Sequence, residues 1–176
     1  MGVGRAPANR ASRSRRERLR ALRTGTIVGL VLLVPAATAW LTGNPFIFPS
    51  LGPSAYFLVA TRERAHRLHH VIVAHLIGVI AGLASYWGLA AGVTVAAARA
   101  PVSLAALQLI ASGVVSVVLT SAAMKLLHVE HPPACATTLI VSLGLLPSVS
   151  DGGFIMLAVV IMALGYRVFL HPRPLL

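Results

Sequence analysis

The sequence predicts an all-α polytopic membrane protein, and its composition, its apolar runs and the placement of its charges support this class. Of 176 residues, 57% are hydrophobic and 11% are charged, and the mean hydropathy is +0.83. A soluble domain of this length carries far more charge. From residue 24 onward, several apolar runs reach the roughly 20 residues that a membrane-spanning helix needs.

The first 23 residues form a basic segment that we expect to be a disordered cytoplasmic arm lying against anionic lipid. Eight of the fifteen basic residues lie here, opposed by a single acid, Glu17, so the net charge of +11 does not indicate a nucleic-acid partner. A secretory signal or an organelle transit peptide is the alternative for this segment. We interpret the following apolar run as a retained helix, because it has a counterpart later in the chain.

Four long apolar runs and two short ones predict six helices, over residues 24–42, 53–60, 71–97, 102–127, 133–146 and 152–170. The two short runs each open with proline. At 1.5 Å per residue they rise about 12 and 21 Å, less than a hydrocarbon core of about 30 Å. They are therefore either re-entrant segments or crossings completed by extended backbone.

The distribution of basic residues favours six crossings with both termini in the cytoplasm. In that topology fourteen of the fifteen basic residues lie inside and only Arg99 lies outside. If both short segments are re-entrant, the division is eleven against four, which fits the positive-inside rule less well. Residues 171–176 then form a cytoplasmic tail, and we expect a bacterial plasma membrane.

The order long, short, long occurs twice, over 24–97 and 102–170, and predicts a 3+3 inverted repeat. An odd number of crossings in each half places the halves in opposite orientation. In transporters with such repeats, paired short segments interrupted by glycine or proline mark the binding site.

The starts of the two short segments are the predicted binding site for a small solute. Proline suits the first turn of a helix, where the exposed N–H groups and the helix dipole attract anions. We expect backbone N–H groups and hydroxyls from both starts to converge at the middle of the membrane, and His131 to donate to an anion or to carry a coupled proton. The candidate residues are Ser50, Gly52, Pro53, Ser54, Ala55, His131, Pro132, Pro133, Ala134, Cys135, Thr137 and Thr138.

A polar stripe on the fourth predicted helix is a possible pathway, formed by Gln108, Ser112, Ser116, Thr120 and Lys125. Interhelical hydrogen bonding and pore lining explain this stripe equally well. On the third predicted helix, His75 shares a face with Gly78 and Gly82. We interpret the glycines as packing residues and place His75 near the cytoplasmic interface.

Two segments resemble the HPP family of integral membrane proteins. His131-Pro132-Pro133 with its continuation to Thr138 is the motif that names the family, and residues 48–56 resemble the family's first short segment. The resemblance spans about residues 24–170. Relatives in plastids and cyanobacteria are linked to nitrite transport, so the resemblance implies a transporter or channel for a small monovalent inorganic anion, most probable among them nitrite, rather than an enzyme.

Two other functions stay open from the sequence. Clusters around His66–His70 and His128–His131 imitate the histidine boxes of membrane metalloenzymes, although the chain has only seven histidines and we predict no metal and no cofactor. A membrane assembly subunit without a solute pathway is the other alternative. A homo-oligomer is compatible with each of these functions.

Overall fold

The computed structural model describes residues 8–43, 48–60, 68–99 and 101–170, and the regular secondary structure within them is all helix, as expected. Four helices are long and apolar enough to cross a membrane, and a single 3₁₀ turn, η1, accompanies them. The elements are α1 (Ala8–Thr42), α2 (Leu51–Ala60), α3 (Leu68–Leu89), η1 (Ala97–Arg99), α4 (Leu104–Leu126), α5 (Ala134–Ser142) and α6 (Val149–Leu170).

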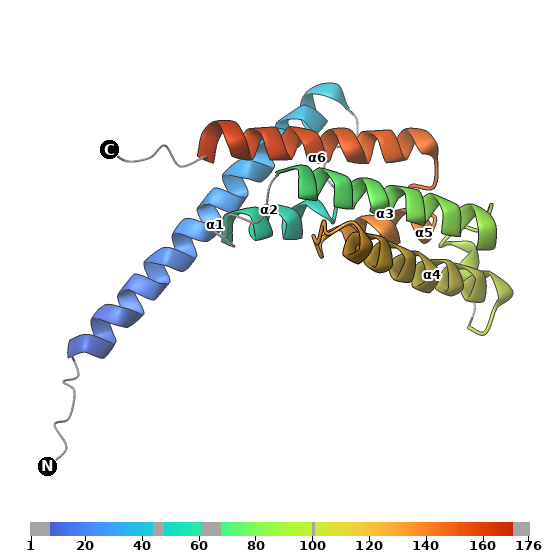
Figure 1. Ribbon diagram of the computed structural model, residues 1–176, viewed down its shortest axis with the longest axis horizontal. Coiled ribbons are helices and arrows are strands. Elements are labelled where there is room, and N and C mark those ends of the chain that lie inside the picture. Colours follow the sequence, from blue (N-terminus) through green and yellow to red (C-terminus); the bar gives the residue numbers. More distant parts are fainter. Residues whose placement is uncertain (1–7, 44–47, 61–67, 100, 171–176) are drawn as a thin grey trace, which may run out of the picture.

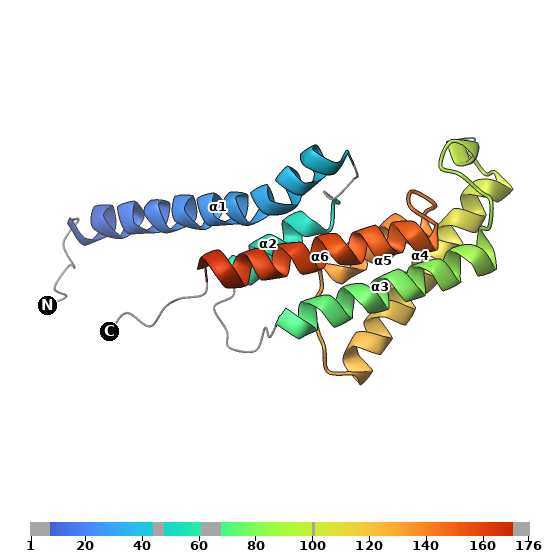
Figure 2. The same cartoon turned by 90° about the horizontal axis from the view of Figure 1, so that it is seen from above.

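The helices alternate in direction along the long axis of the molecule (Figure 1). The start of α1 and the end of α6 lie at the same end of the bundle, and the N-terminal half of α1 diverges from the other helices (Figure 2). The short helices α2 and α5 occupy opposite halves of the bundle, and each begins near its middle. Both short helices therefore start in the interior rather than at an end.

The six helices form two groups by their contacts. Helices α3, α4 and α5 pack closely on one another, whereas α1 and α2 pack together with α6. We refer to these as the α3–α4–α5 group and the α1–α2–α6 group. The third helix of each half of the sequence thus packs with the short helix of the other half, and contacts between α3 and α6 connect the groups.

The basic arm is a correction to the sequence-based expectation. Residues 8–23 continue without a break into α1, so this part of the predicted disordered arm is helical. The segment is rich in alanine, arginine and leucine, which favour helix, and contains neither glycine nor proline. The apolar helix behind it supplies the nucleus that an isolated segment lacks. Residues 1–7 lie outside the described residues.

Two helices end earlier than the apolar runs predict, because a glycine with positive φ follows each. Helix α3 ends at Leu89 and Gly92 has φ of 78°, while α5 ends at Ser142 and Gly144 has φ of 72°. Behind α5 the amide of Gly144 donates to the carbonyl of Val141 at 3.0 Å, a typical closure of a helix C-terminus. Apolar composition continues through both turns, so periodicity does not reveal these ends.

The glycines of α3 allow the close helix contact that the sequence predicted. A Cβ atom on Gly78 would lie 2.8 Å from the carbonyl oxygen of Ala134, and one on Gly82 would lie 2.8 Å from Cβ of Val141. The packing interpretation of Gly78 and Gly82 is therefore confirmed. By contrast, a Cβ on Gly88 would meet no described atom within 4 Å.

Candidate functional site

The starts of the two short helices meet at the hydroxyl of Ser54. Ser54 Oγ donates to the backbone carbonyl of Ser50 at 2.8 Å, within the first turn of α2. It also lies 2.9 Å from Nε2 of His75 on α3 and 3.1 Å from Nε2 of His131, just before α5. Three parts of the chain that are distant in sequence therefore converge on one oxygen atom.

The proton inventory of this contact assigns the donors. A serine hydroxyl has one proton and two lone pairs. When the proton of Ser54 is directed at the Ser50 carbonyl, the oxygen accepts from both histidines. In this assignment both imidazoles carry a proton on Nε2, and two N–H donors point at one place.

The second ring nitrogen of His75 is bonded to α5. Nδ1 of His75 lies 2.6 Å from Oγ1 of Thr137. The ring of His131 lies 5.3 Å from that of His75, and the ring of Phe57 from α2 meets His131 edge-on, also at 5.3 Å between centroids. Polar contacts thus hold both imidazoles, and the ring of Phe57 also packs against His131.

The site is fully enclosed within the protein. Ser50, Ser54, His75, His131 and Thr137 all have 0% of their surface exposed. Within the described part of the chain, Ser50 Oγ has no hydrogen-bond partner. Serine at the N-cap usually accepts from the third amide of its helix, but here that residue is Pro53, which has no N–H. A buried hydroxyl left in this state costs about 1–3 kcal/mol.

The first amides of α5 do not point at a solute, contrary to expectation. The amide of Ala134 donates to the His131 carbonyl at 2.9 Å, and that of Cys135 donates to the Pro132 carbonyl at 3.0 Å. A tight turn before the helix uses these groups, as is common at helix ends. The donors that converge in this structure are instead the imidazole N–H groups.

The remaining predicted residues of the two starts have different environments. Gly52 borders a largely apolar groove against α1, together with Phe48 and Pro49, whereas Pro53 is exposed. Ala55, Pro133, Ala134 and Thr138 are buried, Pro132 is exposed, and the half-buried Cys135 lies 3.9 Å from Ser121 Oγ. These residues shape the surroundings of the histidines rather than the contact on Ser54 Oγ.

The polar stripe of α4 faces α5, and its hydroxyls form interhelical hydrogen bonds. Ser112 Oγ donates to the Ser142 carbonyl at 2.8 Å, and Ser116 Oγ lies 2.9 Å from Ser142 Oγ. Oγ1 of Thr120 lies 2.8 Å from Oγ1 of Thr138, which itself donates to the Gly78 carbonyl at 2.6 Å. These contacts match the packing explanation of the stripe.

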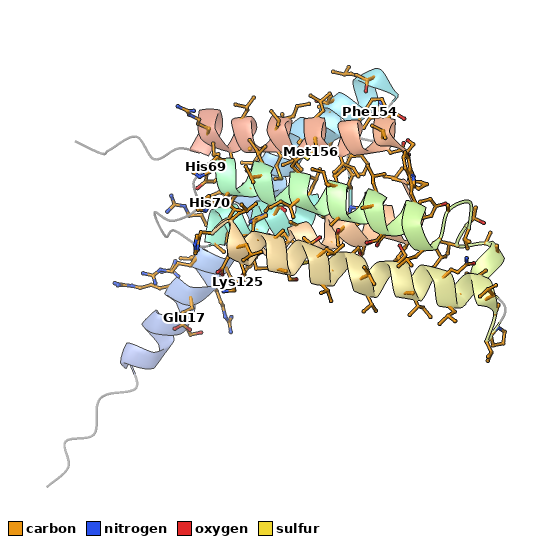
Figure 3. The ribbon with its side chains drawn as sticks, turned by 45° about the vertical axis from the view of Figure 1, so that its right-hand side comes forward. Glu17, His69, His70, Lys125, Phe154 and Met156 are labelled. Carbon is orange, nitrogen blue, oxygen red and sulfur yellow. The ribbon has the colours of Figure 1, made fainter. Side chains whose placement is uncertain are left out.

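The two ends of the stripe behave differently. Gln108 is partly exposed, and Lys125 is exposed and donates to Glu130 Oε1 at 2.6 Å. This hydrogen bond, and next the charge of Lys125, lower the pKa of the Glu130 carboxyl. Figure 3 shows Lys125 at the same end of the bundle as His69 and His70, whose rings stack edge-on at 4.3 Å.

His75 is the site residue that the sequence interpretation misplaced. It is a buried member of the site, not an interfacial residue. The available signal was the helix face that it shares with Gly78 and Gly82, because glycines in close contact with another helix imply that the whole face is buried. Because His75 lies near the start of a long helix, its position in the sequence suggested the membrane interface. The predicted site included only residues at the starts of α2 and α5.

The histidine boxes are only partly within the described residues. His66 and the neighbouring Arg62, Arg64 and Arg67 lie outside them. Among the side chains that the structure describes, no group of three or more His, Cys, Asp or Glu residues is placed to hold a metal ion.

Comparison with known proteins assigns the family. The family described as HPP, transmembrane region, matches residues 11–170, nearly the whole chain. No curated protein and no solved structure matches the chain. The match includes both short helices and the buried contact between them. The chain therefore belongs to the HPP transmembrane family of integral, multi-pass membrane proteins.

Proposed function

We propose that the protein transports a small monovalent anion, nitrite first among the candidates, through the site formed by Ser54, His75 and His131. The observation that carries this proposal is the convergence of two buried imidazole nitrogens on one hydroxyl oxygen, which itself donates to the Ser50 carbonyl. An oxygen of a small anion needs the same donors that Ser54 Oγ now uses. Hydrogen bonds from an imidazole N–H to an anion are stronger than those to a neutral hydroxyl.

The two helix starts add to the attraction for an anion. Helices α2 and α5 both begin beside this oxygen, and each contributes a partial positive charge at its N-terminus. Ser50 supplies an independent indication of a ligand, since its buried hydroxyl proton has no acceptor in the described structure. A bound anion would accept this proton and remove the cost of the unsatisfied group.

The topology that we propose for transport has six crossings, with both termini and the basic residues of α1 on the cytoplasmic side, where they meet anionic lipid. The start of α1 and the end of α6 lie at the same end of the bundle, which supports this topology. The 3+3 inverted repeat remains part of this proposal. The packing of α3 with helices of the second half, and of α6 with helices of the first half, is compatible with such a repeat.

Anion uptake into proteoliposomes tests the transport function. We expect nitrite uptake above that of protein-free liposomes, and a decrease of about 10-fold or more for His131→Leu, because leucine cannot supply the imidazole N–H hydrogen bond to the anion, which contributes about 1.5–3 kcal/mol. Tyr86→Phe is the matched control, since it also removes the hydrogen bond of a buried side chain but lies near the end of α3, away from the site. Uptake equal to that of empty liposomes for nitrite, nitrate, chloride and formate alike refutes the function.

A further inference from the structure

In the hydrogen-bonded chain Thr137–His75–Ser54–His131, the imidazole of His75 can change its protonation while keeping both of its hydrogen bonds. When the proton of Ser54 is directed at the Ser50 carbonyl, His75 donates from Nε2 to Ser54. When His75 is neutral, its Nδ1 accepts the hydroxyl proton of Thr137, across 2.6 Å. When Nδ1 is protonated, the same threonine oxygen accepts instead, after rotation of its hydroxyl.

We infer that His75 takes up a proton together with the anion, so that the protein is a proton–anion cotransporter. This inference rests on the proposed transport function. The proton comes from water on the side of entry, binds to Nδ1 of His75, and leaves to water when the anion leaves. The transported pair is then electrically neutral.

The need for this proton follows from the surroundings of the site. An unpaired charge in a buried, poorly polar environment costs many kcal/mol. Of the described side chains bonded to His75, α2 contributes Ser54 and α5 contributes Thr137, and neither carries a charge near neutral pH. The charged side chains of the other described helices that pack on α3 lie in end turns: Lys125 on α4, and Asp151 and Arg167 on α6.

The other titratable group that contacts His75 is His131, and the ring contact of 5.3 Å opposes a positive charge on both histidines at once. Lys125 is exposed and already paired with Glu130. One imidazolium is therefore the counter-charge that the described site offers. His75 is the better carrier, because Thr137 stands ready to exchange its donor and acceptor roles.

Coupling between the proton and the anion can be measured as the number of protons taken up for each anion bound. Sites that share a favourable charge interaction raise each other's affinity by the same factor. We expect the wild-type protein in detergent to take up about one proton for each anion bound, as linkage requires. Calorimetry of nitrite and nitrate binding in buffers with different ionisation enthalpies measures this number directly.

The variant His75→Gln isolates the proton. Its amide N–H can still donate to Ser54, but the side chain cannot be protonated. We expect anion binding to weaken at least about 10-fold, because the counter-charge is lost, and the binding that remains to show proton uptake near zero. Uptake driven by a pH gradient should fall by a similar factor, the loss expected for about 1.4 kcal/mol or more. His69→Gln, at an exposed histidine on the same helix, should leave both quantities unchanged.

Uptake into proteoliposomes distinguishes anion transport itself from its coupling to a proton. The membrane potential is clamped with potassium and valinomycin, and nitrate accompanies nitrite because nitric acid, a strong acid, does not leak across lipid as a neutral molecule. An anion uptake rate that increases with the pH gradient and does not change with the membrane potential supports cotransport.

Wild-type uptake that follows the potential and ignores the pH gradient overturns the proton inference while preserving anion transport. Loss of coupling in His131→Gln but not in His75→Gln also overturns it, because His131 is then the proton carrier. Absence of both anion binding and uptake in the wild type instead refutes the proposed function itself.

Discussion

The two helix groups of this protein are held together by different forces. In the α3–α4–α5 group, hydroxyls bond between helices, as Thr120 does to Thr138 and Thr138 to the Gly78 carbonyl. In the α1–α2–α6 group, the threonines of α1 bond within their own helix, as Thr38 does to the Val34 carbonyl. Its contacts between helices come mainly from apolar side chains such as Leu51, Ile155 and Met162.

This difference indicates which part of the site is held firmly. Directional hydrogen bonds and the glycine contacts fix α5 against α3 and α4. Apolar contacts fix α2 less firmly, because lipid tails are as apolar as the side chains that they replace. The candidate site lies where the groups meet, with Ser54 from α2 opposite His75 and Thr137. We therefore expect Ser54 to anchor a comparatively mobile α2 to a rigid partner.

The largest expected effect comes from breaking the tight group at its glycines. Gly78→Ala and Gly82→Ala each place a Cβ atom within 3 Å of α5 backbone or side-chain atoms, so each should cost about 1–3 kcal/mol. Thermal unfolding in detergent measures this loss. Gly88→Ala meets nothing in the described structure and should be neutral or stabilising by up to about 1 kcal/mol. Equal melting temperatures for all three variants contradict the close contact.

A second pair of variants compares the two serines at the start of α2. Ser54→Ala leaves two buried imidazole N–H groups without their acceptor and should destabilise the protein by about 2–3 kcal/mol. Ser50→Ala removes a buried hydroxyl that has no described partner, so the anion-free protein should keep or gain stability. The rise in melting temperature on adding nitrite should nevertheless shrink in Ser50→Ala. An undiminished rise excludes Ser50 from the anion site.

A smaller effect is expected from the hydroxyl pair between α4 and α5. Thr120→Val keeps the shape of the side chain and removes its hydrogen bond, which should cost about 0.6 kcal/mol, a usual value within a membrane protein. Anion uptake per folded molecule should not change, because Thr120 has a packing role. A selective loss of uptake at normal stability shows instead that the stripe lines the pathway.

The smallest effect concerns Lys125 and Glu130. Because the pKa of Glu130 is lowered by Lys125, the pair stabilises the fold above the ordinary carboxyl pKa, and this contribution disappears as the pH falls through the lowered value. Both side chains are largely exposed, so Glu130→Gln should leave the melting temperature nearly unchanged at neutral pH. A large decrease at neutral pH that is absent at acidic pH reveals a stronger role for this pair.

Much of the architecture was predictable from the order of residues along the chain. Long apolar runs specify spanning helices because lipid requires internal hydrogen bonding of the backbone. Proline marked the starts of α2 and α5, and the spacing of Gly78 and Gly82 predicted a close helix contact. The ends of α3 and α5, and the helical state of residues 8–23, were not predictable, because local turns and continuity with a neighbouring helix decided them.

The candidate site divides in the same way. The amino-acid order by itself determined that Ser54 and His131 stand at the starts of two short helices within a membrane protein. Only the tertiary structure decided that His75 joins them and that the amides of Ala134 and Cys135 are already bonded. The physical reason is that a hydrogen bond between distant segments depends on how helices pack, and close packing against α5 turned one face of α3, with its histidine, into the interior.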